Sequence, residues 1–137
     1  MRLRLAPLSA LLLAACATTL PRGPVLERTA TAPVVDFLLT SAATDFHAHR
    51  PPDPIRFRQV RVAHRTEGSG PSQDLLCGEF LPAGEGAQWT PFATIKTSGY
   101  EQWVGGQASA FCQGPSVTFD PGVDLSGALL ERLNSVR

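Results

Sequence analysis

The sequence predicts an α+β fold in which a small antiparallel β-meander of three to four strands packs with an N-terminal and a C-terminal helix. Apolar residues recur at helical spacing near both ends of the chain, and apolar and polar residues alternate in the segments between them. The chain has 137 residues, of which 43% are hydrophobic, so one domain with a core is possible. The 12 glycines and 12 prolines indicate many turns.

The N-terminal helix is predicted over residues 31–47. Its apolar stripe consists of Val35, Leu38, Leu39, Ala42 and Phe46. Thr31 is the expected cap, and Pro33 is tolerable in the first turn. The sequence Pro51-Pro52 and the following Asp53-Pro54 must end the helix and start an extended segment.

A strand is predicted over residues 55–65, with a β-bulge near Gln59. Ile55 and Phe57 alternate with arginines, and the apolar phase then shifts by one residue to Val60 and Val62. Because side chains in a strand point to alternate faces, such a shift indicates one extra residue.

The rest of the meander is predicted as strands over 74–81 and 89–97, with Trp89, Ala93 and Ile95 on one face of the latter and Phe92 on the other. Residues 100–112 are ambiguous, and we expect a short strand or an irregular segment there. The C-terminal helix is predicted over residues 125–136, with Asp124 as a cap. Its apolar side consists of Leu125, Leu129, Leu130 and Leu133.

The first 16 residues have the zones of a secretory signal. Arg2 and Arg4 precede an apolar run that ends in small residues, and the run is too short for a permanent membrane span. Leu13-Ala14-Ala15-Cys16 resembles the lipobox of bacterial lipoproteins. The resemblance implies cleavage before Cys16 and lipid on its thiol, and two or three acyl chains anchor a protein stably where one does not. An ordinary signal peptide with a chance cysteine is the alternative.

The predicted organisation is therefore a signal peptide over 1–15, the lipidated Cys16 with a flexible tether over 16–28, and one α+β domain over 29–137. Ala17 follows the cysteine, where an aspartate would favour the inner membrane, so we expect the outer membrane with the domain facing the periplasm. Loss of Arg2 and Arg4 lowers the basic residues from 12 to 10 against 12 acidic ones, which does not favour nucleic acid as a partner.

Cys77 and Cys112 remain in a compartment where thiols oxidise, and an even pair there predicts a disulfide. A redox-active pair or two zinc ligands are the alternatives. The sequence has no Cys-x-x-Cys spacing and no histidine at finger spacing to support them.

Several short motifs in the middle third of the chain resemble a family of small secreted bacterial proteins. These are Asp53-Pro54, Phe57-Arg58, Val60-Arg61, Cys77-Gly78-Glu79 and Pro91-Phe92. The chain departs from that pattern after Glu79, where the family has an Asn-rich turn. The resemblance implies a meander and no particular activity.

Two sets of residues are candidates for a partner surface. One is a basic row of Arg56, Arg58, Arg61 and Arg65, which suits an anionic partner or a solvated face balanced by acids. The other is an aromatic set of Trp89, Phe92, Tyr100 and Trp103, which suits a binding patch or core packing.

The sequence contains few candidates for metal-binding or catalytic residues. His47 and His49, near Asp45, could share a metal ion if their segment is extended, or they are solvated residues at a helix end. Glu79 could act as a general acid or base if it is buried. No nucleophile motif, phosphate loop or zinc-protease motif is present, so the sequence predicts no cofactor and no catalytic residue.

We therefore expect a non-enzymatic binding or structural accessory domain that is anchored to a membrane and meets an envelope protein or glycan. One alternative is a periplasmic inhibitor or sensor of an envelope hydrolase, in the manner of a lysozyme inhibitor, with an inserting loop at residues 66–72. The other is a metal-binding protein that uses His47 and His49.

Overall fold

The computed structural model describes residues 29–137, so the predicted signal peptide over 1–15, the predicted lipidation of Cys16 and the predicted tether over 16–28 all concern residues outside the described part. The elements in chain order are α1 (Ala32–Ala48), β1 (Pro54–Arg65), β2 (Gln73–Pro82), β3 (Thr90–Lys96), β4 (Tyr100–Val104), α2 (Gly106–Cys112), β5 (Val117–Phe119) and α3 (Ser126–Val136). Within this part of the chain, no helix is long and apolar enough to cross a membrane.

The five strands form one sheet in the order β4-β3-β2-β1-β5, and all neighbours are antiparallel. Strands β1 to β4 are the predicted meander. The predicted number of strands was one too low, because β5 returns after α2 and pairs with the far end of β1 through Ala63, His64 and Arg65. The α+β prediction is thus confirmed, with a fifth strand added.

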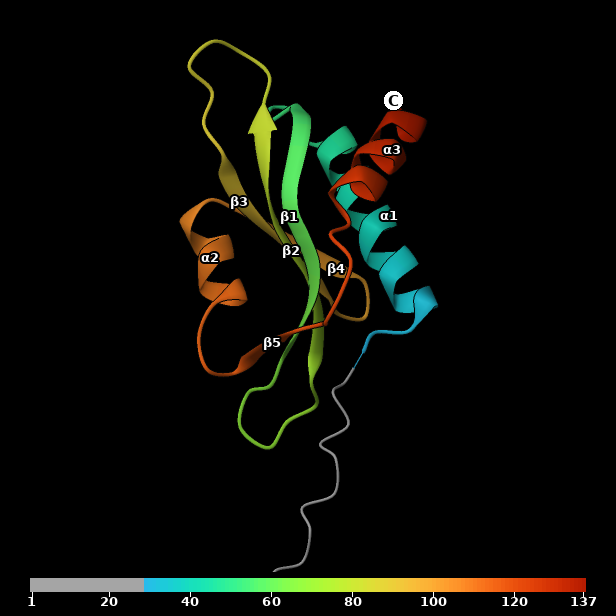
Figure 1. The fold of residues 1–137 in the computed structure, drawn as a ribbon, viewed down its shortest axis with the longest axis vertical. Coiled ribbons are helices and arrows are strands. Elements are labelled where there is room, and N and C mark those ends of the chain that lie inside the picture. Colours follow the sequence, from blue (N-terminus) through green and yellow to red (C-terminus); the bar gives the residue numbers. More distant parts are fainter. Residues whose placement is uncertain (1–28) are drawn as a thin grey trace, which may run out of the picture.

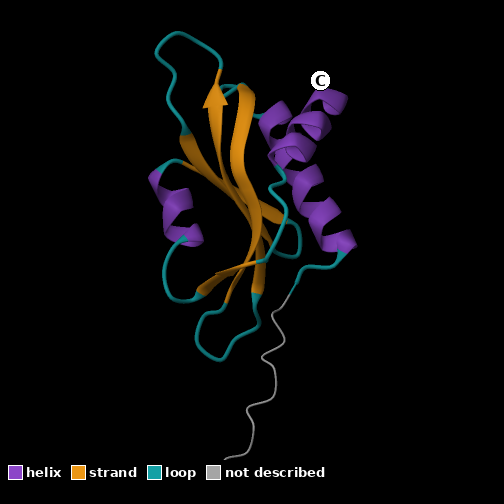
Figure 2. Cartoon of the chain, in the orientation of Figure 1, coloured by secondary structure: helices purple, strands orange, loops and turns teal. Residues whose placement is uncertain are grey.

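The helices lie on both faces of the sheet. Helices α1 and α3 pack side by side on one face, and the short α2 lies against the other face (Figures 1 and 2). The predicted N-terminal and C-terminal helices are confirmed within one residue at each end. Helix α2 was not predicted.

The main core lies between the sheet and the α1–α3 layer. Phe46 of α1 stands at its centre, with its ring 5.1 Å from Phe80, 5.4 Å from Phe92 and 5.7 Å from Phe57. Leu129 and Leu133 bring α3 into the same core. Ring pairs at these separations add to the stabilisation from apolar burial by about 0.5–1.5 kcal/mol each.

Gly78 allows β2 to approach this core closely. A Cβ on Gly78 would lie 2.8 Å from Val60 Cγ2 and 3.0 Å from Phe92 Cε1. Its place in the Cys77-Gly78-Glu79 segment is therefore a packing requirement.

The predicted bulge in β1 is confirmed. The pairing of β1 with β2 shifts register between Arg58 and Arg61, and Gln59 has a φ of 54°. Val60 lies three positions after Phe57, and in a regular strand an odd separation would place the two side chains on opposite faces. Because of the extra residue, Val60 and Val62 face the same core as Phe57.

The two predicted helix caps differ in outcome. Thr31 immediately precedes α1, but its side chain makes no capping hydrogen bond. Asp124 lies one residue before the N-cap of α3, and its Oδ1 accepts the Ser126 amide at 2.8 Å. The hydrogen bond from the Ser126 side chain, together with backbone amides, lowers the pKa of Asp124.

Candidate functional site

The bulge gives the sheet face that carries α2 a continuous row of arginines. Arg56 and Arg58 are two residues apart and point to this face together. Arg61 follows three residues after Arg58, and only the extra residue at Gln59 returns it to the same face. With Arg65 at the end of β1, these four side chains form what we call the arginine row.

Each guanidinium of the arginine row stacks on an aromatic ring. Trp89 lies beneath two of them, with Arg58 Cζ 4.3 Å and Arg56 Cζ 5.7 Å from the ring centroid. Arg61 lies 5.0 Å above Phe119 of β5, and Arg65 lies 5.1 Å above Phe111 of α2. Stacking of this kind contributes about 0.5–1 kcal/mol at exposed sites and holds the cation in place.

The four arginines differ in whether their guanidinium group is paired with a carboxylate. Arg58 Nε donates to Glu79 Oε2 at 2.7 Å, and Arg65 pairs with Glu67. Arg61 Nη2 donates to the backbone carbonyl of Asp120 at 2.9 Å. Within residues 29–137, neither Arg56 nor Arg61 has a carboxylate partner, so these two retain unneutralised positive charge at the surface.

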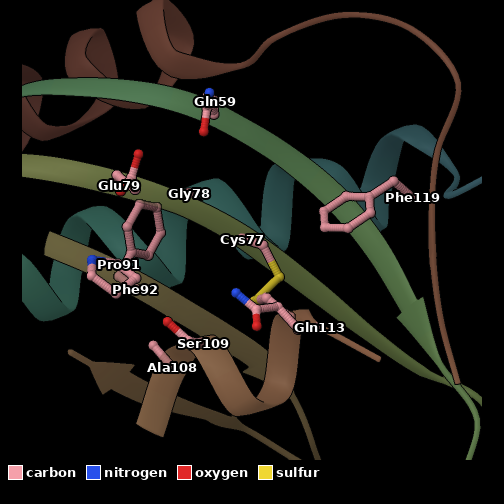
Figure 3. Close-up of a pocket in the computed structure, with 11 residues that line it drawn as sticks. Gln59, Cys77, Gly78, Glu79, Pro91, Phe92, Ala108, Ser109, Gln113 and Phe119 are labelled. Atoms are coloured by element: carbon pink, nitrogen blue, oxygen red, sulfur yellow. A yellow bond between two sulfur atoms is a disulfide. The ribbon is translucent and has the colours of Figure 1, made fainter. Parts of the chain in front are cut away.

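A cavity of about 350 Å³ opens beside the row, between the sheet and α2. Figure 3 shows its walls, with Gln59, Gly78, Glu79 and Pro91 from the strands facing Ala108 and Ser109 of α2. The Cys77–Cys112 disulfide closes one side.

The cavity combines polar groups with an apolar floor. Gln59, Glu79, Ser109 and Gln113 offer amide, carboxylate and hydroxyl groups, and the Phe119 ring under Arg61 is also part of the lining. Glu79 is 27% exposed and held by Arg58, so it is an ion-pair partner rather than a lone buried acid. The arrangement suits binding of a polar or anionic group more than proton transfer.

The disulfide predicted from the cysteine count is confirmed, because Cys77 of β2 and Cys112 of α2 are bonded. It ties α2 to a second, smaller core of Ala63, Leu75, Cys77 and Ile95. Closing a loop with a sequence separation of 35 stabilises the fold by about 4 kcal/mol in the chain-entropy account.

The aromatic candidates separate into different roles. Trp89 belongs to the arginine row, and Phe92 is in the main core. Trp103, predicted as a member of the partner surface, packs 5.4 Å from the Phe111 ring and against the second core. Core packing, the alternative weighed for these residues, therefore accounts for Phe92 and largely for Trp103.

His47 and His49 do not form the extended pair that a shared metal ion would need. His47 lies in the last turn of α1, beside Arg50, and His49 ends the helix with its Nδ1 3.2 Å from Asp45 Oδ1. In the part of the chain that the structure describes, no group of three metal-ligating side chains converges. The helix-end alternative is the one observed.

The structure contains a buried polar cluster that was not predicted from the sequence. His64 is 5% exposed, and its ring lies between Asp74 Oδ1 (2.8 Å from Nδ1) and Asp120 Oδ1 (2.5 Å from Nε2). Asp120 Oδ2 also accepts the Ala30 amide at 2.9 Å. No local sequence signal joins residues that are 10, 56 and 90 positions apart.

In comparisons with known proteins, no family model, no curated protein and no solved structure matches this chain. The resemblances to lipoproteins and to small secreted proteins therefore remain predictions from the sequence.

Proposed function

We propose that this chain is a bacterial lipoprotein, anchored to the outer membrane through lipid on Cys16, whose domain is a non-enzymatic binding module facing the periplasm. The lipobox sequence Leu13-Ala14-Ala15-Cys16 supports the anchor. The Cys77–Cys112 disulfide supports an oxidising compartment, because such bonds are rare where thiols are kept reduced.

The partner that we propose is an anionic envelope component, either a protein or a glycan, bound at the arginine row. The observation that carries this proposal is that all four guanidinia are positioned over aromatic rings while Arg56 and Arg61 have no carboxylate partner within the described residues. A guanidinium offers a planar set of donors that matches carboxylates and phosphates. Pre-positioned side chains also lose less entropy on binding.

The anchor is tested by mass spectrometry of the native protein. We expect an acylated N-terminal Cys16, and we expect Cys16→Ser to release the domain from the membrane fraction. An uncleaved, unmodified N-terminus with reduced Cys77 and Cys112 would contradict both the anchor and the compartment.

The binding face is tested by site-specific photocrosslinking in intact envelopes. A crosslinker at Arg56 should capture a defined partner, and Arg61→Ala should weaken that capture. A crosslinker at Glu131, exposed on α3 across the sheet, is the matched control. Equal capture from both positions would reject the arginine row as the binding face.

Inhibition of an envelope hydrolase is a second candidate function. The loop between β1 and β2 projects from the end of the sheet (Figure 1), its residues 66–71 are all exposed, and a hydrogen bond from the Gly70 amide to the Glu67 carbonyl shapes its turn. A loop of this form could insert into a catalytic cleft. Undiminished lysozyme activity in the presence of excess domain would remove this candidate for that enzyme.

A further inference from the structure

Strand β4 forms one edge of the sheet, and in the described sheet it pairs with another strand on one side only. Its partner is β3, and the register between the two strands is regular, without a bulge. Proteins commonly protect an edge strand with a lysine, a proline, a bulge or a very short length. β4 has five residues, none of which is lysine or proline, whereas β5 at the other edge has three residues. The proposed function makes no use of β4.

Hydrogen bonds next to both ends of β4 show which of its residues bond to β3. The Gly105 amide donates to the Pro91 carbonyl, and the Thr97 amide donates to the Gly99 carbonyl. Pairs that exchange hydrogen bonds alternate along an antiparallel ladder with pairs that do not. The odd-numbered residues of β4 therefore bond to β3, and the even-numbered residues direct their backbone groups away from it.

The residues that direct their backbone groups to the open edge are Tyr100, Gln102 and Val104. They present three N–H donors and three C=O acceptors there, and none of these groups has a hydrogen-bond partner among residues 29–137. An extended segment that lies antiparallel to β4 can bond to all of them, as in other proteins that bind peptides at a sheet edge.

The α1 face of this edge suits apolar side chains of an added strand. Val104 is 44% exposed although it is a large hydrophobic residue. A cavity of about 410 Å³, lined in part by Asp45, Gln102 and Val104, lies between α1 and β4 and leaves room on this face. Because side chains directly opposite each other in a sheet are in contact, apolar residues opposite Tyr100 and Val104 would cover the exposed apolar surface.

The α2 face of the same edge carries a negative charge. Glu101 is exposed, and its Oε2 accepts a hydrogen bond from Trp103 Nε1 at 3.4 Å. In the part of the chain that the structure describes, Glu101 forms no salt bridge. Opposite charges that face each other across two strands stabilise their pairing, so a basic residue opposite Glu101 is the matching one.

We propose that β4 binds an extended segment of a partner protein, which adds to the sheet as an antiparallel sixth strand. The segment has apolar residues opposite Tyr100 and Val104 and a lysine or arginine opposite Glu101. It is bound at the strand edge, so its binding is independent of the arginine row and of lipid on Cys16.

A second copy of this chain fits the edge less well. Antiparallel pairing of two β4 strands about Gln102 would place Trp103 of the second copy opposite Glu101, where the charge calls for a cation. The two Glu101 side chains would also lie diagonally on one face, where like charges are close enough to repel.

The test uses five-residue peptides, acetylated and amidated, that are titrated into the purified full chain with its disulfide intact. The basic peptide is Val-Thr-Val-Lys-Val, whose lysine lies opposite Glu101 when the central valine pairs with Gln102. The acidic peptide has glutamate in place of the lysine. By nuclear magnetic resonance, we expect the backbone amides of Tyr100, Gln102 and Val104 to gain protection from hydrogen exchange. The basic peptide should bind about fivefold more tightly than the acidic one.

N-methylated peptides distinguish an added strand from other modes of binding. A methyl group on the nitrogen of the central valine removes the donor that faces Gln102 and should abolish binding. A methyl group on the threonine nitrogen, which points away from β4, is the matched control and should be tolerated.

Charge reversal tests the contact with Glu101. Glu101→Lys changes an exposed side chain and should make the acidic peptide the tighter binder. Glu131→Lys, exposed on α3, is the matched control and should leave the preference for the basic peptide unchanged.

Three results would each overturn the proposal: neither peptide protects the three amides, both N-methylated peptides bind equally, or Glu101→Lys keeps the original preference. Protection of the same amides without any peptide, in a chain that sediments as a dimer, would also overturn it and assign the edge to a second copy.

Discussion

His64 Nε2 and Asp120 Oδ1 lie 2.5 Å apart, joining the C-terminal end of β1 to the segment that leads into α3. Asp74 Oδ1 contacts the other ring nitrogen, Nδ1, at 2.8 Å. Asp120 is 14% exposed and Asp74 17%, so neither carboxylate is well solvated. The stability of this cluster therefore depends on the His64 ring that lies between the two carboxylates.

Replacing His64 should strongly destabilise the domain. His64→Ala leaves two poorly solvated carboxylates without their partner, and breaking a buried pair in this way costs about 3–5 kcal/mol. Chemical denaturation followed by circular dichroism measures the change, with the exposed His47→Ala as the control. A loss of no more than about 0.5 kcal/mol, as for an ordinary surface substitution, would show that the cluster is not a structural tie.

Two glycine substitutions should have opposite effects on stability. Gly78→Ala places a methyl group 2.8 Å from Val60 Cγ2 and 3.1 Å from Val60 Cα, where backbone must move, so we expect a loss of about 1–3 kcal/mol. Gly127→Ala lies in α3 with nothing within 4 Å of the added carbon and should stabilise by about 0.5–1 kcal/mol. Thermal unfolding of both variants checks this pair, and similar effects of the same sign would contradict the close approach at Gly78.

Removing the disulfide should loosen α2 before the rest of the domain. Cys77→Ala with Cys112→Ala should lower the free energy of unfolding by about 2–4 kcal/mol. Hydrogen exchange should rise first in α2, because that seven-residue helix depends on the second core and the covalent bond. Reductant should reproduce the effect in the parent chain and leave the double variant unchanged; a reductant effect on the double variant would point to another cause.

The Tyr100 phenol should titrate above its ordinary pKa of 10.0. Burial is the largest cause, followed by the charge of Asp45 and the hydrogen bond to it. Because the folded state holds this proton more tightly, the resulting stability is present below pH 10.0 and is lost as the pH rises through the raised pKa. Tyr100 is the only tyrosine, so phenolate absorbance reports it directly.

Asp45→Asn removes the negative charge and leaves only a neutral amide oxygen to accept the hydroxyl, so it should move the Tyr100 pKa back towards 10.0. Glu131→Gln, on the exposed side of α3, should leave it in place. An unchanged titration in Asp45→Asn would mean that the Tyr100 hydroxyl and the Asp45 carboxylate do not meet in solution.

Local patterns predicted the parts of the fold that carry their own periodicity. The spacing of Leu38, Leu39, Ala42 and Phe46 was enough for α1, and the phase shift at Gln59 was enough for the bulge. Helix α2 was missed because its seven residues begin within the Gly105-Gly106 pair, at Gly106, and show too little periodicity to separate a helix from a strand. Strand β5 has three residues, and only pairing with β1 makes it a strand.

The candidate sites were predictable only in their side-chain types. The arginines of β1 were visible in the sequence, but the rings beneath Arg61 and Arg65 belong to β5 and α2, the two elements that were missed. Similarly, Asp45 and Gln102 lie 57 positions apart and meet at one cavity because α1 packs over one face of the sheet at β4. Contacts of this range follow from topology rather than from local pattern.

Because of the extra residue at Gln59, the folding of β1 should be more sensitive to a deletion at this position than to a change of side chain. Gln59 is exposed, so the fold should tolerate other side chains there that accept its positive φ. Deleting the position would exchange inside and outside along half the strand, sending the Val60 and Val62 methyl groups to solvent and the Arg61 charge into the phenylalanine core. Among natural variants of this strand, deletions at that point should therefore be rarer than substitutions.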